Sequence, residues 1–162
     1  MQLTLDLQVL LLVIVANGAP LAAKAILGEK LSVPLDAGHI FSDGRPLFGT
    51  SKTVRGLVVG VGAGALCALL LGFDWTIGLL IGAAALAGDL VSSFIKRRMD
   101  LAPGSQVVGL DHIPESLVPA LVAMPLVGLT LFDVAVVTAL FAAGGLISSL
   151  VLAKLRPENQ PH

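Results

Sequence analysis

Five apolar runs, each close in length to a membrane-spanning helix, dominate this sequence and limit the folds that it can adopt. A helix needs about 20 apolar residues to cross the hydrocarbon core of a bilayer. The runs cover residues 7–23, 57–73, 75–95, 117–131 and 134–152. We therefore predict an all-α, polytopic membrane protein with about five transmembrane helices, folded as a single domain over residues 1–162.

Composition agrees with this fold class and excludes others. Hydrophobic residues make up 56% of the chain and charged residues only 13%, against roughly 25% charged residues in a typical soluble domain. The net charge of −1 argues against nucleic-acid binding, which needs a basic surface. The single cysteine, Cys67, lies within an apolar run and is expected to be a small buried hydrophobe.

The segments between and within the runs refine the prediction. Gly72-Phe73-Asp74-Trp75 and Phe132-Asp133 leave room only for tight turns between antiparallel helices. The fourth run contains Pro119 and Pro125, so a kinked or re-entrant segment stays open as an alternative to a full crossing. Glycines four residues apart in the second and third runs are expected to let helix backbones approach closely.

The ten Lys and Arg residues indicate the orientation in the membrane. They are Lys24, Lys30, Arg45, Lys52, Arg55, Lys96, Arg97, Arg98, Lys154 and Arg156. Five crossings place all of them on one side and leave Asp6, Asp74 and Asp133 on the other, whereas four crossings would divide them. The positive-inside rule then predicts an N-terminus outside and a C-terminus in the cytoplasm.

The first of two polar stretches on the basic side covers residues 34–56 and leads into the second apolar run. Ser51, Thr53 and the backbone N–H groups near Lys52 are expected to form a helix N-terminus with affinity for anions. Lys52 and Arg55 would lie beside such an anion. As an alternative, these two cations serve only as topology anchors at the membrane surface.

The second polar stretch covers residues 88–116. On a helix, Asp89, Ser92 or Ser93, and Lys96 share one face. Because an ionisable group at membrane depth is costly, Asp89 is a candidate functional residue. An internal salt bridge from Asp89 to Lys96 or Arg97 is the structural alternative.

Together the two stretches provide the groups that a magnesium nucleotide requires. Carboxylates such as Asp89 and Asp111 bind a hard divalent cation, and nearby Lys and Arg side chains neutralise phosphate oxygens. Phosphoryl or nucleotidyl transfer needs mainly such positioning and charge neutralisation. A second interpretation is a small ion or solute transporter that uses Asp89 as its coupling site, although transporters usually bind near the bilayer midplane. A structural membrane subunit is a third.

Three strings of residues resemble the CDP-archaeol synthase family, which is related to the CDP-diacylglycerol synthases. They are Asp36-x-Gly38 with Asp43-Gly-Arg-x-x-x-Gly49-x-x-Lys-Thr-x-Arg-Gly56, then Gly88-Asp-x-x-x-Ser-Phe-x-Lys-Arg-Arg98, and Leu110-Asp111. The resemblance implies a five-helix catalytic domain in the cytoplasmic (inner) membrane with its active site facing the cytoplasm. Such an enzyme transfers CMP from CTP to a lipid phosphate, requires Mg²⁺ and releases pyrophosphate.

The resemblance and the charge pattern together assign the candidate site residues. Asp89 and Asp111 are predicted to hold Mg²⁺, and Lys96 to act with them in catalysis. Six other residues complete the predicted CTP site, of which Asp43 and Arg45 would fix the cytidine or the lipid headgroup. The predicted CTP-binding residues are Lys52, Thr53, Arg55, Arg97, Asp43 and Arg45. The expected partners are CTP, a lipid phosphate of unspecified type and membrane lipids, with no nucleic acid; a homodimer is left open.

Overall fold

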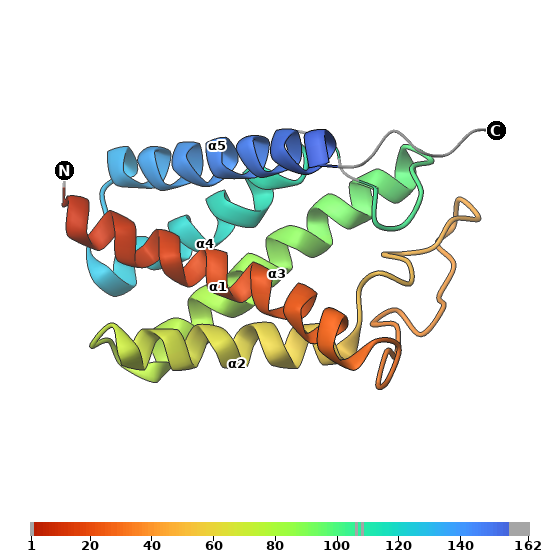
Figure 1. The fold of residues 1–162 in the computed structure, drawn as a ribbon, viewed down its shortest axis with the longest axis horizontal. Coiled ribbons are helices and arrows are strands. Elements are labelled where there is room, and N and C mark those ends of the chain that lie inside the picture. Colours follow the sequence, from red (N-terminus) through yellow and green to blue (C-terminus); the bar gives the residue numbers. More distant parts are fainter. Residues whose placement is uncertain (1, 106, 108, 156–162) are drawn as a thin grey trace.

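The computed structural model describes residues 2–105, 107 and 109–155, which form five α-helices in the order predicted (Figure 1). Within these residues there is no β-strand, and only two isolated β-bridges occur, both in the connection that follows the first helix. The helices are α1 (Leu3–Leu27), α2 (Val54–Leu70), α3 (Trp75–Arg98), α4 (His112–Val127) and α5 (Leu131–Leu155).

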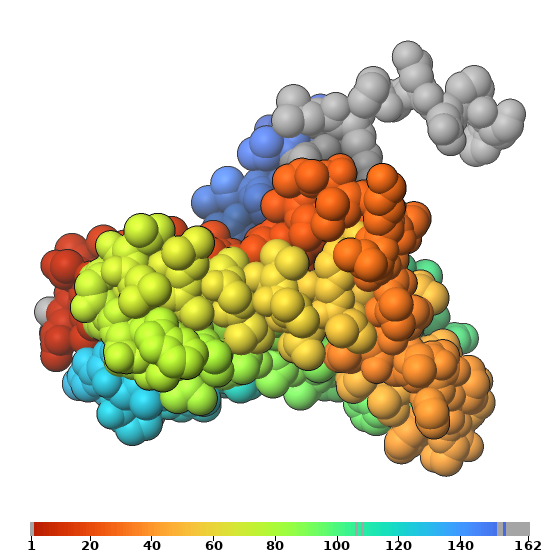
Figure 2. All heavy atoms as spheres, turned by 90° about the horizontal axis from the view of Figure 1, so that it is seen from below, coloured from red at the N-terminus to blue at the C-terminus, as the bar shows by residue number. Residues whose placement is uncertain are grey.

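Consecutive helices run in opposite directions, which separates the molecule into two ends (Figure 1). The start of α1 and the short α2–α3 and α4–α5 turns lie at one end, which we name the turn end. The loops of residues 28–53 and 99–111 lie at the other end with the end of α5, and we name it the loop end. Figure 2 shows loop 28–53 (orange) projecting there beyond the start of α2. Every Lys and Arg in the described part of the chain lies at or near the loop end.

Two predicted boundaries are wrong, both because polar residues near a helix start were assigned to loops. Helix α4 begins at His112, five residues before the apolar run. Helix α5 begins at Leu131, so Phe132-Asp133 lies in its first turn. There the Asp133 carboxylate accepts hydrogen bonds from the Thr130 N–H (3.0 Å) and hydroxyl (2.7 Å), and the Thr130 hydroxyl accepts from the Asp133 N–H (3.3 Å). This reciprocal capping box fixes the helix start.

Helix length separates the five predicted crossings into two groups. Three helices are long and apolar enough to span a bilayer: Leu3–Leu27, Trp75–Arg98 and Leu131–Val151. Helices α2 and α4 have 17 and 16 residues, or roughly 25 Å each at 1.5 Å per residue. Helix α4 continues through Pro119 and Pro125. Five crossings therefore remain a prediction for the two shorter helices.

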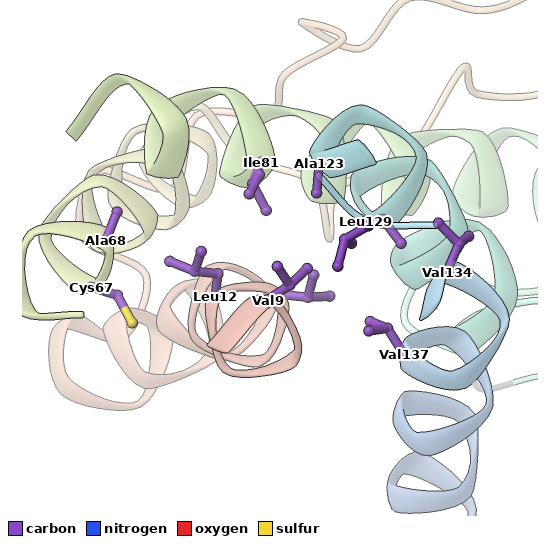
Figure 3. Packing of buried hydrophobic residues seen from close by; sticks show 11 residues of the cluster. Val9, Leu12, Cys67, Ala68, Ile81, Ala123, Leu129, Val134 and Val137 are labelled. Atoms are coloured by element: carbon purple, nitrogen blue, oxygen red, sulfur yellow. The ribbon is translucent and has the colours of Figure 1, made fainter. Parts of the chain in front are cut away.

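A compact apolar core occupies the turn end (Figure 3). Val9 and Leu12 of α1 lie at its centre, and neither is exposed. Around them pack residues from the other four helices: Cys67, Ala68, Ile81, Ala120, Ala123, Val134 and Val137. Cys67 is a buried free cysteine, as predicted. Asp6 and Asp133 are buried here as well; they lie at the turn end, opposite the Lys and Arg residues, as the charge pattern predicted.

Close glycine contacts set the spacing of the first three helices. A Cβ atom on Gly78 of α3 would collide with the carbonyl oxygen of Gly64 on α2, and one on Gly60 of α2 would lie 2.7 Å from the carbonyl oxygen of Ala16 on α1. Gly62, also on α2, has nothing within 4 Å of that position. The predicted role of the spaced glycines in helix packing is confirmed at these positions.

We expect Gly78→Ala to destabilise the protein, because overpacking typically costs about 1–3 kcal/mol. Gly62→Ala is the matched control and should leave the thermal midpoint in detergent unchanged or slightly raised, because alanine favours helix. Thermal unfolding of the two variants beside the unsubstituted protein measures the difference. Equal midpoints for both variants would contradict the contact between α2 and α3.

Candidate active site

A cavity of about 1070 Å³ lies at the loop end and is lined by all five helices and both long loops. Seven of the nine predicted site residues line it: Lys52, Thr53, Arg55, Asp89, Lys96, Arg97 and Asp111. Its other walls are apolar and include Ile14 and Leu21 of α1, Leu86 of α3 and Phe141 of α5. The cavity therefore joins a charged region to an apolar one.

Lys52 reaches the cavity from the end of loop 28–53. The Leu35 N–H donates to the Lys52 carbonyl at 2.8 Å, and Thr53 caps α2 by accepting from the Gly56 N–H at 3.1 Å. The Lys52 ammonium contacts both carboxylate oxygens of Asp89 at 2.5 Å. Asp89 thus pairs with Lys52 of the first loop, and the predicted alternative pairing with Lys96 or Arg97 is wrong.

Lys96 forms a second ion pair, with Asp111, at 2.6 Å. Both side chains are buried, with exposed fractions of 8% and 10%. The Lys96 ammonium also donates to the carbonyl of Ser105 at 2.9 Å, while Asp111 accepts from the Val107 N–H at 2.8 Å. Lys96 therefore attaches loop 99–111 to α3, and Lys52 attaches loop 28–53 to α3.

Glu115 adds a third carboxyl group that was not among the predicted site residues. It lines the same cavity as Asp89, Lys52 and Asp111. The close crossing of α3 and α4 explains this, because a Cβ on the neighbouring Gly88 would collide with the Pro114 carbonyl. One signal was present in the sequence: Glu115 follows Asp111 by four residues, which is one helical turn.

The two buried arginines of the cavity differ in what they bind. Arg97 is 4% exposed and donates to the Ala102 carbonyl at 2.8 Å. Its Nε and Nη1 atoms have no hydrogen-bond partner among the described residues. Arg55 donates to the carbonyls of Gly28 (3.0 Å) and Lys30. These hydrogen bonds hold the turn that follows α1. Arg97 is thus the better placed of the two to receive an anion.

Asp43 and Arg45 are not among the cavity-lining residues. Asp43 pairs with Arg98 at 2.8 Å, and Arg45 contacts Asp100 at 3.6 Å. The Arg98 guanidinium also lies 4.8 and 4.6 Å from the ring centroids of Phe41 and Phe94. These contacts attach the tip of loop 28–53 to the end of α3. A role of Asp43 and Arg45 in holding cytidine or a headgroup stays a prediction.

His112 and His39 also differ from each other. His112 is the first residue of α4, lines the cavity and packs edge-on against Phe141 of α5. A Cβ on Gly145 would lie 2.5 Å from its ring. His39 is exposed in loop 28–53. The His112 ring therefore connects α4 to α5.

Within the described residues, no group of three or more His, Cys, Asp or Glu side chains is arranged to hold a metal ion. The donor set nevertheless fits magnesium, because Mg²⁺ is usually held by one or two carboxylates together with substrate phosphates. Asp89 and Asp111 line the same cavity. Each forms an ion pair with a lysine, and the phosphate oxygens of a ligand could replace the carboxylate as the partner of that lysine.

Comparison with known proteins identifies relatives of this chain. Residues 2–155 match the profile of the CarS-like CDP-archaeol synthase family. The CDP-archaeol synthase of Pyrococcus furiosus is 39% identical over 107 residues, which cover 60% of each chain. That of Staphylothermus marinus is 39% identical over 113 residues, covering 66% of this chain and 61% of the relative. The chain thus spans about three-fifths of the length of these relatives.

A solved structure has the same fold. It is described as an intramembrane enzyme for archaeal membrane lipid biosynthesis, and it matches with a TM-score of 0.71 and 29% identity. The match covers 88% of this chain and 91% of the other. Together with the three long apolar helices, this similarity identifies the chain as an integral membrane protein.

Proposed function

The chain belongs to the CDP-archaeol synthase family, and on this basis we propose that it is a CTP-dependent cytidylyltransferase acting on a lipid phosphate. The observation that carries the proposal is the cavity that joins a cluster of cations and carboxyl groups to an apolar wall. Such a site suits a reaction between a water-soluble triphosphate and a membrane lipid. The cluster includes the cations Lys52, Lys96 and Arg97 and the carboxyl groups of Asp89, Asp111 and Glu115.

The cations of the cavity are placed to bind the triphosphate. Lys52 and Lys96 are each within 3 Å of a carboxylate. Arg97 lines the same cavity and has buried N–H groups that have no partner in the described part of the chain. Charge-assisted hydrogen bonds from such groups position the phosphates and offset the charge of the departing pyrophosphate. Asp89 and Asp111 would hold Mg²⁺, which supplies further charge neutralisation at the phosphates when bound.

The apolar wall provides for the lipid. Ile14 and Leu21 of α1 face the cavity on one side, and Leu140 and Phe141 of α5 on another. A lipid that enters between these helices keeps its chains in apolar surroundings and brings its phosphate to the charged region. An oxygen of this phosphate then attacks the α-phosphorus of CTP. The bond to the β-phosphate oxygen breaks, and the products are a CDP-lipid and pyrophosphate.

The transporter interpretation is not favoured. The charged groups lie at the loop end of the bundle, whereas transporters usually bind their substrates near the bilayer midplane. Similarity to CDP-archaeol synthases adds to this preference.

We place the active site on the cytoplasmic side of the cell membrane. The concentration of Lys and Arg at the loop end supports this orientation by the positive-inside rule, and CTP is a cytoplasmic nucleotide. Since α2 and α4 connect the loop end to the turn end, the same orientation requires five crossings. The turn end, with Asp74, would then face the outside.

The test of the proposed activity is CTP-dependent release of pyrophosphate by the purified protein with magnesium. We expect release only when a lipid phosphate is added, and an unsaturated ether-lipid phosphate and phosphatidic acid are both to be tried. Asp89→Asn should abolish turnover while leaving the fold intact, because it removes an anionic ligand without changing size. Asp74→Asn, at the other end of the bundle, is the control and should retain activity. Full turnover by Asp89→Asn would contradict the proposed role.

Cysteine labelling tests the orientation. In a Cys67→Ala background, a cysteine replacing the exposed Ser42 of loop 28–53 should be shielded from an impermeant reagent added to intact cells. A cysteine replacing the exposed Asp74 of the α2–α3 turn should react. Both should react after permeabilisation. Labelling of the Ser42 position from outside would reverse the orientation and exclude a site that uses cytoplasmic CTP.

A further inference from the structure

Asp36 is a buried acidic residue of loop 28–53 that is not among the residues lining the charged cavity, and among the described residues its carboxylate accepts hydrogen bonds only from backbone groups. It is 7% exposed. One oxygen accepts a hydrogen bond from the Gly38 N–H at 3.1 Å, and the other accepts from the N–H groups of Phe48 (3.0 Å) and Gly49 (2.9 Å). Burial alone would raise the pKa of Asp36, but these N–H groups outweigh it and hold the pKa below its ordinary value. Asp36 is therefore a carboxylate anchor for the loop backbone.

The segment that Asp36 holds is the turn that leads to Lys52. Gly49 has a φ of +89°, a conformation that favours glycine, and its carbonyl accepts from the Lys52 N–H at 3.2 Å. The residue next to Asp36, Leu35, donates its N–H to the Lys52 carbonyl at 2.8 Å. Both ends of the Gly49–Lys52 turn are thus attached to the Leu35–Asp36 segment.

The same turn also contacts the second loop and the buried arginine. A Cβ built on Gly49 would lie 3.1 Å from the side chain of Pro103 and 3.6 Å from Nη1 of Arg97. The turn therefore lies between two cations of the charged cavity. Lys52 is its last residue, and Arg97 lies next to its first residue, Gly49. A shift of the turn would move the Lys52 ammonium relative to Arg97.

We propose that Asp36 is a positioning residue for the nucleotide: its carboxylate holds the Gly49–Lys52 turn where the Lys52 ammonium can bind a phosphate oxygen. This inference rests on the proposed function. Asp36 touches neither the cavity nor its charged groups, so its effect on the nucleotide passes through Lys52. This dependence separates it from a residue that only stabilises the fold, because a general loss of stability would not depend on the side chain at position 52.

A double-mutant cycle on the full chain tests the dependence. CTP affinity is measured by calorimetry for the unsubstituted protein, Asp36→Asn, Lys52→Ala and the double variant. We expect Asp36→Asn to weaken binding about tenfold, the low end of what a charged hydrogen bond provides, and to weaken it no further when Lys52 is already alanine. The KM for CTP should rise while the KM for the lipid phosphate stays unchanged. Asp36→Glu, which keeps the carboxylate, should recover part of the affinity.

Two further variants keep the test decisive. Asp74→Asn loses a carboxylate that accepts the Thr76 N–H at 2.8 Å at the turn end, and it should leave CTP affinity unchanged. Gly49→Ala disturbs the same turn without altering Asp36, and it should show the same dependence on Lys52 if Asp36→Asn does not fold. An unchanged affinity in Asp36→Asn, or an equal loss with and without Lys52, would overturn this inference alone. Failure of the unsubstituted protein to bind CTP would overturn the proposed function and this inference with it.

Discussion

Two lysine–aspartate ion pairs, Lys52–Asp89 and Lys96–Asp111, determine how the loop end of this protein is built. In each pair one partner lies on α3 and the other on a long loop or at its end. Removing one partner of the buried Lys96–Asp111 pair would cost several kcal/mol, and the Lys52–Asp89 pair, which is about one-fifth exposed, holds its loop against α3 at a lower cost of rupture. Because α3 also packs against α1, α2 and α4, it is the support on which both loops are placed.

This arrangement depends on the apolar half of the molecule. At the turn end the helices meet through small residues such as Gly64 and Gly78, and apolar side chains pack around Leu12. At the loop end the close crossing at Gly88 brings Asp89 and Glu115 to the same cavity. Beyond the core, toward the loop end, the helices enclose the cavity. Side chains of α1 and α5 form an apolar wall beside its charged groups. Substrates of opposite polarity can therefore meet at one place.

Hydrophobic runs predicted the five helices and their order, and the distribution of Lys and Arg predicted one charged end. These features depend on local sequence, where residue type and spacing carry the information. Contacts between distant segments were harder to predict. The partner of Asp89 proved to be Lys52 instead of Lys96, because backbone hydrogen bonds within loop 28–53, such as that from Leu35 to Lys52, fix the position of Lys52 in a way that periodicity does not reveal. Glu115 was not predicted as a site residue, and Asp36 was assigned no role, because their contacts also join segments distant in sequence. The start of α5 was missed because the Thr130–Asp133 capping box resembles a turn.

We propose that Asp89 and Asp111 would hold a shared cation when nucleotide binds, and that Lys52 and Lys96 would then bind the phosphates. An experimental structure with CTP and magnesium measures this directly. The account predicts that the two carboxyl groups lie within about 5 Å of each other on one metal, as metal–oxygen distances near 2.1 Å require, with both ammonium groups on phosphate oxygens. Carboxyl groups more than about 10 Å apart, with no metal or bridging water between them, would contradict it.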